Sequence, residues 1–429
     1  MIRPTRAWRA AAVLATASLV LTACGGGGDE TDTADDPAGS ESTSESAEAE
    51  PTGDGVLRIG SLLPQTGDLA FLGPPEFAGV DLAIQEINAA GGVLGADVEE
   101  FDADSGDGTP DIAGAEVDGL FNKNVDAIIG AAASGVSVSV IDKITGNGTV
   151  HFSPANTAAG FDTYDDNGLY FRTAPSDRLQ GQVLGNLAVE DGHQNVAVMA
   201  RQDFYGEGLA DQVEATLEER GATVTDKVLY AADAQNFTAE VNQIAANQPD
   251  ALVLIAFEET TKIIPQLIAK GIGPQDIQLY FVDGNLADYS DENFDLAGVK
   301  GTIPVSGNPD PEFNDKLLEI DPKIKDFTYG PQSYDATMII ALAAIAAGDD
   351  SGEAIGAEII NVTKDGTQCS TFEECAQLLE DGEDIDYEGA SGPTDMNDTG
   401  SPASGTIGIN EYSKGNTYKE TDTVSGVVN

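Results

Sequence analysis

The fold is decided by residues 57–92, which contain the segments LRIGSLL at 57–63 and FAGVDLAIQEINAAGG at 77–92. The first segment predicts a buried strand that ends at Pro64, because proline has no N–H group to donate within a sheet. In the second segment apolar residues recur at helical spacing, at Phe77, Val80, Ile84 and Ile87. A strand-like segment follows at 98–104, so this part of the chain predicts a strand–helix–strand unit.

The alternation of strands and helices continues along the chain. Further strands are expected at 125–129, 150–152, 195–199, 223–229, 251–256 and 277–282. Helices are expected from Thr109-Pro110-Asp111 and at 137–144, 177–190, 206–220, 237–246 and 260–270. Such alternation predicts parallel sheets covered by helices on both faces, and there are too many units for one open sheet. We therefore expect an α/β protein with two doubly wound parallel-sheet lobes and a ligand cleft at the carboxyl ends of the strands.

The composition of the chain excludes several classes of partner. Its 429 residues include 74 Asp and Glu against 20 Lys and Arg, which gives a formal net charge of −54. Nucleic acid and anionic membrane surfaces are therefore not expected as partners, because both are bound by clustered basic residues. Hydrophobic residues make up 41% of the chain, so it can still bury a core, and the acidic charge concerns the surface and solvent, such as a saline habitat.

The first 24 residues carry the pattern of a secretion signal. Positive charges at Arg3, Arg6 and Arg9 precede an apolar stretch at 10–23, which is too short to span a bilayer comfortably. The stretch ends in LTAC at 21–24, which resembles the lipobox of bacterial lipoproteins. The resemblance implies that residues 1–23 are a signal peptide removed on export and that Cys24 then carries a lipid. An ordinary signal peptide with an accidental cysteine is the alternative.

Residues 24–55 consist mainly of glycine, alanine, hydroxyl and acidic residues and contain no large apolar residue. Such a segment cannot offset its ordering entropy by burying apolar surface, so it predicts a disordered acidic tether. The longest later apolar run, at 336–347, is too short for a membrane span and predicts a buried helix.

Cys369 and Cys375 are the other cysteines of the chain and lie six residues apart. In an outward-facing compartment this pair predicts a disulfide that clips a hairpin or a helix end. A redox-active pair is the alternative, but the sequence offers no CxxC motif or neighbouring cation to activate it.

The sequence lacks the motifs of common catalytic and cofactor sites. There is no phosphate-binding loop, dinucleotide fingerprint or GxSxG motif. We interpret His151 as a strand residue and His193 as a surface residue. The segment DADSGDG at 102–108 has glycine where a calcium loop requires an oxygen ligand, so it predicts a strand-to-helix loop. We expect no catalytic residues, no metal and no cofactor.

Five strings together resemble one known family. They are IGSLLPQTG at 59–67, LAIQEINAAGG at 82–92, FRTAPSD at 171–177, YGEGLA at 205–210 and SYDA at 333–336. In this order they resemble the type 1 periplasmic binding proteins of branched-chain amino acid ABC importers. The tail, with its two cysteines and YEGASGP at 387–393, is similar to an actinobacterial branch of that family.

The resemblance implies two lobes joined by three crossing segments and closing on one ligand. Lobe 1 would comprise 56–174 and 307–388, and lobe 2 would comprise 175–306 and 389–429. It also implies a monomer that is anchored to the outer face of the cell membrane by its lipid and delivers its solute to ABC permease subunits.

Ligand contacts in lobe 1 follow from the same resemblance. Ser134 matches the serine whose hydroxyl and amide hold the ligand carboxylate, which agrees with the positive potential at a helix N-terminus. Ala155 would offer its carbonyl and Thr157 its hydroxyl. Helix capping is the alternative role of both Ser134 and Thr157.

In lobe 2 the resemblance assigns Tyr205 to close over the ligand and Asp283 to pair with its ammonium group, where the family carries glutamate. A charge closed away from water needs a partner, so an acid here implies a cationic ligand group. Phe257 stands where some members have tyrosine. Phe71 and Leu72 would line the pocket for the ligand side chain.

The expected function is therefore capture of an apolar amino acid for an ABC importer. The same fold could instead bind urea, a short amide or a small carboxylate, or serve as a sensory ligand-binding protein. An enzyme is not expected, because the sequence lacks a recognisable set of nucleophile, base and metal ligands.

Overall fold

The computed structural model of the chain describes residues 52–108, 111–305 and 311–428, which belong to one compact unit. The predicted signal peptide, Cys24 and most of the predicted tether lie outside these residues. Thr109 and Pro110 of the expected helix start also lie outside them, and the helix that follows begins at Ala113.

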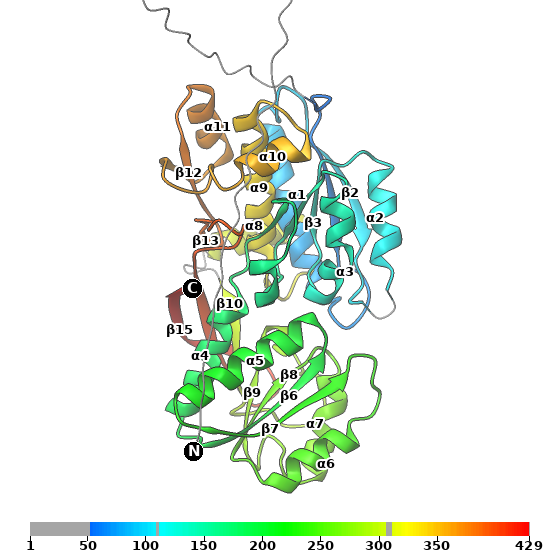
Figure 1. Cartoon of the computed structure of the whole chain (residues 1–429), viewed down its shortest axis with the longest axis vertical. Helices are drawn as coiled ribbons and strands as arrows, with labels where there is room; N and C mark the ends of the chain where they lie inside the picture. Colours follow the sequence, from blue (N-terminus) through cyan, green and yellow to red (C-terminus); the bar gives the residue numbers. More distant parts are fainter. Residues whose placement is uncertain (1–51, 109–110, 306–310, 429) are drawn as a thin grey trace, which may run out of the picture. The chain divides into compact units, whose positions relative to one another are not determined.

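The first lobe contains a five-stranded parallel sheet in the order β2-β1-β3-β4-β5. Its strands are β1 (Arg58–Leu63), β2 (Glu99–Asp104), β3 (Ala127–Gly130), β4 (Val150–Ser153) and β5 (Tyr170–Arg172). The connections carry the helices α1 (Gly73–Ala89), α2 (Ala113–Phe121), α3 (Ser134–Thr145) and the short η1 (Ala159–Thr163). Figure 1 shows α1 on one side of this sheet and α2 and α3 on its other side. The strand–helix–strand unit predicted from the opening segment is thus confirmed.

The second lobe contains a seven-stranded sheet in the order β15-β14-β10-β9-β8-β6-β7. Its strands are β6 (Asn195–Gln202), β7 (Thr223–Ala231), β8 (Ala251–Ile255), β9 (Gln278–Phe281), β10 (Lys300–Val305), β14 (Ser404–Tyr412) and β15 (Tyr418–Val427). Its helices are α4 (Asp177–Glu190), α5 (Phe204–Glu219), α6 (Thr238–Asn247), α7 (Thr260–Ala269) and the short η2 (Asp283–Asn285). Strand β14 pairs antiparallel with both β10 and β15. The expected all-parallel sheet therefore holds only for the strands from β6 to β10.

The last passage between the lobes comes later in the chain than expected. Strand β13 (Gly392–Pro393) still pairs with β12 (Ile385–Gly389) of the first lobe, and Met396 is buried in that lobe's core. The chain joins the second sheet only at β14. The structure therefore places residues 389–403, which were assigned to lobe 2, with lobe 1.

The long helix α9 (Gly330–Ala347) lies at the centre of lobe 1 and contains the run predicted as a buried helix. Its side chains are buried on nearly all sides, and it packs against α1 (Figure 1). Close approach requires glycine, because a Cβ at Gly79 of α1 would lie 2.2 Å from the carbonyl oxygen of Gly330. Helix α8 (Pro311–Ile320) also packs on α1.

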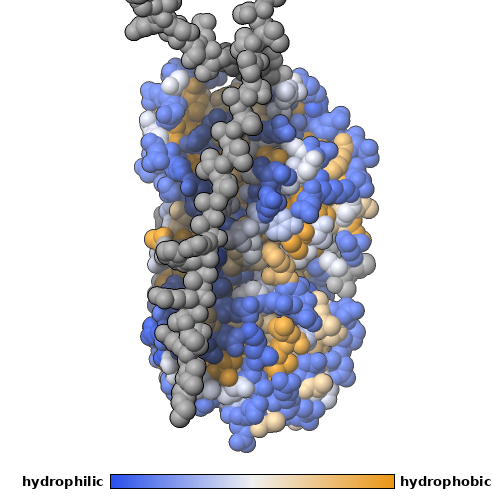
Figure 2. Space-filling model, viewed as in Figure 1, coloured by the Kyte–Doolittle hydropathy of each residue, from blue (hydrophilic) through white to orange (hydrophobic). Residues whose placement is uncertain are grey.

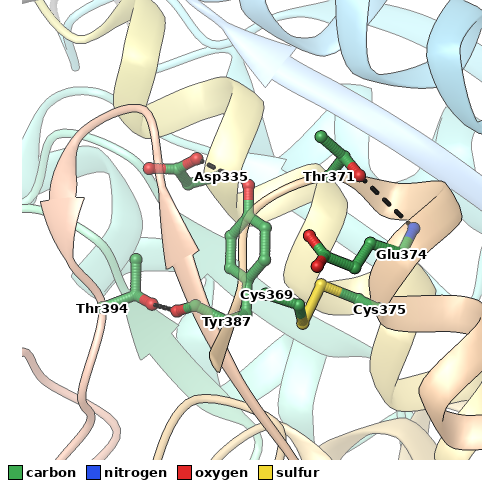
Figure 3. Close-up of a disulfide and its surroundings, with 7 residues drawn as sticks. All are labelled: Asp335, Cys369, Thr371, Glu374, Cys375, Tyr387 and Thr394. Atoms are coloured by element: carbon green, nitrogen blue, oxygen red, sulfur yellow. Dashed lines mark hydrogen bonds between the residues drawn. A yellow bond between two sulfur atoms is a disulfide. The ribbon is translucent and has the colours of Figure 1, made fainter. Parts of the chain in front are cut away.

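The tail of lobe 1 contains α10 (Gly352–Glu358), β11 (Thr367–Cys369) and α11 (Phe372–Glu380). The predicted disulfide is confirmed: Cys369 at the end of β11 is bonded to Cys375 in the first turn of α11 (Figure 3). Thr371 caps the same helix by accepting a hydrogen bond from the Glu374 amide at 3.3 Å. The disulfide is a local clip at a helix start.

The fully buried Asp335 of α9 joins the tail to the lobe core. It accepts hydrogen bonds from the Tyr387 hydroxyl at 2.9 Å, the Ala390 amide at 2.9 Å and the Ser391 amide at 2.7 Å (Figure 3 shows the first). Burial raises the pKa of Asp335 to about 6, and these donors oppose the rise. The strings SYDA and YEGASGP, which are far apart in the sequence, therefore form one contact.

The start of the described chain is held on lobe 1. Two carboxylates, Asp349 and Asp350, accept backbone hydrogen bonds from Thr52, Gly53, Gly55 and Val56. Residues 52–55, the last part of the predicted tether, are therefore fixed to the segment after α9. No helix in the described ranges is long and apolar enough to cross a membrane. The face visible in Figure 2 is mainly hydrophilic, in line with the acidic composition.

Candidate functional site

The carboxyl ends of strands from both sheets meet at one small cavity of about 20 Å³. The residues that follow these ends are Ser134 after β3, Ala155 and Thr157 after β4, Tyr205 after β6, Phe257 after β8 and Asp283 after β9. This is the position expected for a ligand site in doubly wound sheets.

Seven of the eight predicted ligand-contact residues line this cavity: the six named above and Leu72. The structure places the eighth, Phe71, elsewhere. Its side chain lines a wider groove of about 830 Å³ together with acidic residues such as Asp68 and Glu258. Phe71 and Leu72 are neighbours just before α1, and there Leu72 faces the cavity while Phe71 faces the groove.

The lobe 1 wall is formed by the start of α3 and the loop after β4. Ser134 is the first residue of α3 and Ala133 is its N-cap, with no side-chain capping hydrogen bond. Ser134 is therefore not the cap of this helix. Its hydroxyl accepts a hydrogen bond from the Ala158 amide at 3.4 Å. The first N–H groups of a helix have no partner within the helix, so this wall can hold an anionic group.

The two loops of this wall are fixed to each other. The Asn156 amide group donates to the carbonyl of Ala131 at 2.9 Å and to that of Ala132 at 2.8 Å. The Ser153 hydroxyl also donates to the Ala131 carbonyl, at 2.7 Å. Thr157 caps no helix, because η1 begins two residues later with Ala158 as its N-cap. The binding groups of lobe 1 are thus preorganised by buried hydrogen bonds.

The lobe 2 wall is centred on the carboxylate of Asp283, which is 6% exposed. Its Oδ1 atom accepts hydrogen bonds from the Gln180 side chain at 2.7 Å and the Tyr205 hydroxyl at 2.6 Å. Its Oδ2 atom accepts one from the Tyr329 hydroxyl at 2.8 Å. Tyr329 precedes α9 of lobe 1, so this bond joins the two lobes across the cleft. Burial and the charge of Asp283 both raise the pKa of Tyr205, which keeps its hydroxyl a donor.

An aromatic stack forms the apolar part of the lobe 2 wall. The Phe257 ring stacks on Tyr205 with centroids 5.7 Å apart. The Arg201 guanidinium lies 3.4 Å from the Phe257 ring centroid and is paired with Glu259 at 3.0 Å. A cation over an aromatic face is attracted to it, so Arg201 and Glu259 fix the ring from behind.

The segment DADSGDG supports the loop that carries Leu72. The Asp104 carboxylate accepts hydrogen bonds from the amides of Gln65 and Thr66, and Asp107 accepts one from the Asp68 amide at 2.6 Å. No group of three or more metal-binding side chains occurs among the described residues. Because the segment runs from the end of β2 into the connection to α2, the interpretation as a strand-to-helix loop is confirmed. His151 is also the strand residue expected, fully buried in β4, where burial lowers its pKa to about 3.

Several residues of the site were not predicted. They are Leu69, Ala132, Ala133, Gly284 and Tyr329, which line the cavity, and Gln180, which holds Asp283. Gln180 has one local indication in the sequence: it lies one helical turn after Asp177 at the start of α4, so both residues share a face of that helix. Tyr329 had none, because its contact with Asp283 joins distant parts of the chain.

A cleft lined by strand ends of two doubly wound lobes defines the class of two-lobed solute-binding proteins. Residues 56–404 match the periplasmic binding protein family, and the chain belongs to it. The resemblance to type 1 periplasmic binding proteins of the branched-chain amino acid family is confirmed. The chain is accordingly a solute-binding protein and not an enzyme.

Similar proteins of known sequence or structure support this assignment. The chain is 30% identical over 312 residues to Leu/Ile/Val-binding protein homolog 1 of Brucella suis. This alignment covers 69% of this chain and 80% of the Brucella protein. The leucine binding protein LivK of Thermotoga maritima superposes with a TM-score of 0.70 at 22% identity, over 86% of this chain and 98% of that one. A solute binding protein of R. palustris in complex with benzoate superposes with a TM-score of 0.68 at 17% identity, and the match covers 87% of this chain and 98% of that one. Proteins of this fold thus bind chemically different solutes.

Proposed function

We propose that this protein captures an α-amino acid with an apolar side chain and delivers it to the membrane subunits of an ABC importer. The observation that carries the proposal is the opposition of two walls in one cavity. Lobe 1 presents a helix start to an anionic group, and lobe 2 presents the carboxylate of Asp283. An α-amino acid carries both complementary charges on neighbouring atoms.

The charge of Asp283 argues against a purely anionic solute. Its carboxylate is almost fully buried, and its hydrogen-bond donors, Gln180, Tyr205 and Tyr329, are all uncharged. A buried charge without an ionic partner is costly, so a cationic ligand group next to it is favoured. A carboxylate such as benzoate would add a second negative charge without supplying that partner.

The remaining lining of the cavity favours an apolar side chain. Leu69, Leu72 and Phe257 are buried around it, and Ala132 and Ala133 beside Ser134 add small apolar side chains. Among the relatives, the Brucella protein is named for binding leucine, isoleucine and valine, which agrees with this lining. We infer the same ligand class here.

A lipid anchor at Cys24 completes the proposal. The mature protein would be held at the outer face of the cell membrane by the lipid on Cys24. Replacing Cys24 by alanine should block lipidation and leave an unprocessed precursor. Normal maturation and detergent-phase partitioning of that variant would contradict the lipobox assignment.

Calorimetric titration of the exported protein with L-leucine, urea and benzoate tests the ligand class. We expect binding of leucine in the micromolar range or tighter, and weak or no binding of the other two. Tight binding of urea without leucine would favour an amide receptor, because neutral N–H groups can also bond Asp283. Tight binding of benzoate without leucine would contradict the role given to Asp283.

A further inference from the structure

A second acid lies directly behind the cavity. Asp177 is the first residue of α4 and is 0% exposed. Within the described parts of the chain, no hydrogen bond of good geometry reaches either of its carboxylate oxygens. Its amide donates to the Thr157 carbonyl at 2.7 Å, so it is in contact with a residue that lines the cavity.

Gln180 connects this acid to Asp283. It lies three residues after Asp177, on the same face of α4. Its Nε2 atom donates to Asp283 at 2.7 Å, whereas its Oε1 atom is buried without a partner among the described residues. Among the described residues, the Asp177 carboxyl oxygens and Gln180 Oε1 thus have no hydrogen-bond partner of good geometry, and all three atoms lie close to the same cavity. Such an excess of acceptors is complementary to a ligand that carries donors.

The groups around Asp177 are mostly negative. Burial is the largest influence on its pKa and raises it well above the ordinary value, and the charges of Asp283 and Asp162 raise it further. The Thr157 hydroxyl and the Arg172 guanidinium act in the opposite direction. Tyr205 and Tyr329, the other titratable groups that interact with Asp177, remain neutral because burial raises their pKa values as well.

A count of acceptors shows why an ammonium group would engage Asp177. A carboxylate offers about four acceptor sites, and Asp283 already uses three of them for Gln180, Tyr205 and Tyr329. An ammonium group brings three donors, so two of them need acceptors elsewhere. The Ala155 carbonyl and the Thr157 hydroxyl are available on the lobe 1 wall. Thr157 accepts best when its own proton is donated onward to a carboxylate, and Asp177 is the carboxyl group beside it.

We propose that Asp177 is a second acid of the solute site, protonated before the solute binds and ionised when a cationic head group lies beside Asp283 and Thr157. The inference rests on the proposed function, because it requires a cationic solute. The proton leaves Asp177 for the solvent as the positive head group arrives. Binding of an amino acid therefore releases up to one proton, whereas binding of a neutral amide releases none.

Proton release and pH dependence test the role of Asp177. Titration of the exported protein with L-leucine, in two buffers of different ionisation enthalpy, counts the protons released. We expect release of up to about one proton per leucine below the pKa of Asp177, and an affinity that rises by up to about tenfold per pH unit there. In Asp177→Asn both the release and the pH dependence should disappear.

Asp126→Asn is the matched control. Burial raises the pKa of Asp126 to about 7, but this residue precedes β3 at the amino end of the sheet, away from the cavity. This variant should release as many protons as the wild type.

Binding of leucine to the wild type without proton release would overturn the role of Asp177 and leave the proposed function intact. An unchanged release in Asp177→Asn would also overturn it. If Asp177→Asn does not fold, the number of protons released by the wild type still tests the role of Asp177. A failure of the wild type to bind any amino acid would instead refute the proposed function itself.

Discussion

The two walls of the cleft differ in the chemistry that they offer to a solute. Lobe 1 contributes small side chains and a helix start, with Ser134 beside Ala132 and Ala133. Lobe 2 contributes the acidic side chain of Asp283, surrounded by aromatic groups. An anionic group can be held by several backbone dipoles at once, whereas a cationic group depends on a few acceptors. The lobe 2 wall should therefore be more sensitive to single substitutions.

The largest expected effect comes from removing the charge of Asp283. Asp283→Asn keeps the shape of the side chain but leaves a bound ammonium group without its ionic partner, a loss of about 3–5 kcal/mol for a buried pair. We expect leucine binding to weaken by roughly two to three orders of magnitude in calorimetric titration. Asp291→Asn, which removes the same charge from an exposed position of lobe 2, should bind like the wild type. Equal affinity of Asp283→Asn and wild type would contradict the ammonium contact.

A smaller effect is expected on the opposite wall. Ser134→Ala removes one hydroxyl but leaves the backbone N–H groups of α3 in place, so binding should weaken by about 1–3 kcal/mol. Ser139→Ala on the same helix provides the control, because its exposed hydroxyl bonds only the Val136 carbonyl among the described residues. A larger loss for Ser134→Ala than for Asp283→Asn would reverse the proposed difference between the walls.

The disulfide tests whether the stability of lobe 1 can be separated from its binding wall. Replacing both Cys369 and Cys375 by serine should lower the free energy of unfolding by roughly 2 kcal/mol or less, because the closed loop is short. The melting temperature should fall by a few degrees. Leucine affinity should not change, because the clip joins β11 to α11, and neither element lines the cavity. A marked loss of affinity would show that the tail and the wall are coupled.

The smallest expected effect concerns an acid on the outer part of lobe 1. Burial raises the pKa of Glu100 to about 8, although the Ser61 hydroxyl donates to it at 2.6 Å. Its contribution to stability is fully present below about pH 4.5 and is lost as the pH rises through 8. Glu100→Gln should therefore stabilise the protein by about 1–2 kcal/mol at pH 8 and have no effect near pH 4.

Thermal unfolding at the two pH values measures this effect. Asp97→Asn, a change at an exposed neighbouring acid, should melt like the wild type at both. If Glu100→Gln is not more stable than the wild type at pH 8, then Glu100 does not carry the raised pKa described above.

The sequence predicted the cavity well wherever a contact residue follows a strand. Ser134, Tyr205 and Asp283 each lie shortly after the end of a strand, and parallel strands bring their carboxyl ends to one edge of the sheet. Strand positions follow from local periodicity, which can be read from a few neighbouring residues. Phe71 shows the limit of this reasoning, because local pattern does not tell which of two adjacent loop side chains faces a cavity.

The sequence by itself determined the alternation of strands and helices, the strand ends that carry the site, and the disulfide, because each depends on a short segment. Only the tertiary structure decided which groups surround the Asp283 carboxylate. Gln180 and Tyr329 lie 103 and 46 residues away from it in sequence. The tertiary structure also decided that Asp177 is buried without a partner of good geometry among the described residues. Burial and long-range partners result from the packing of whole lobes, which no local pattern records.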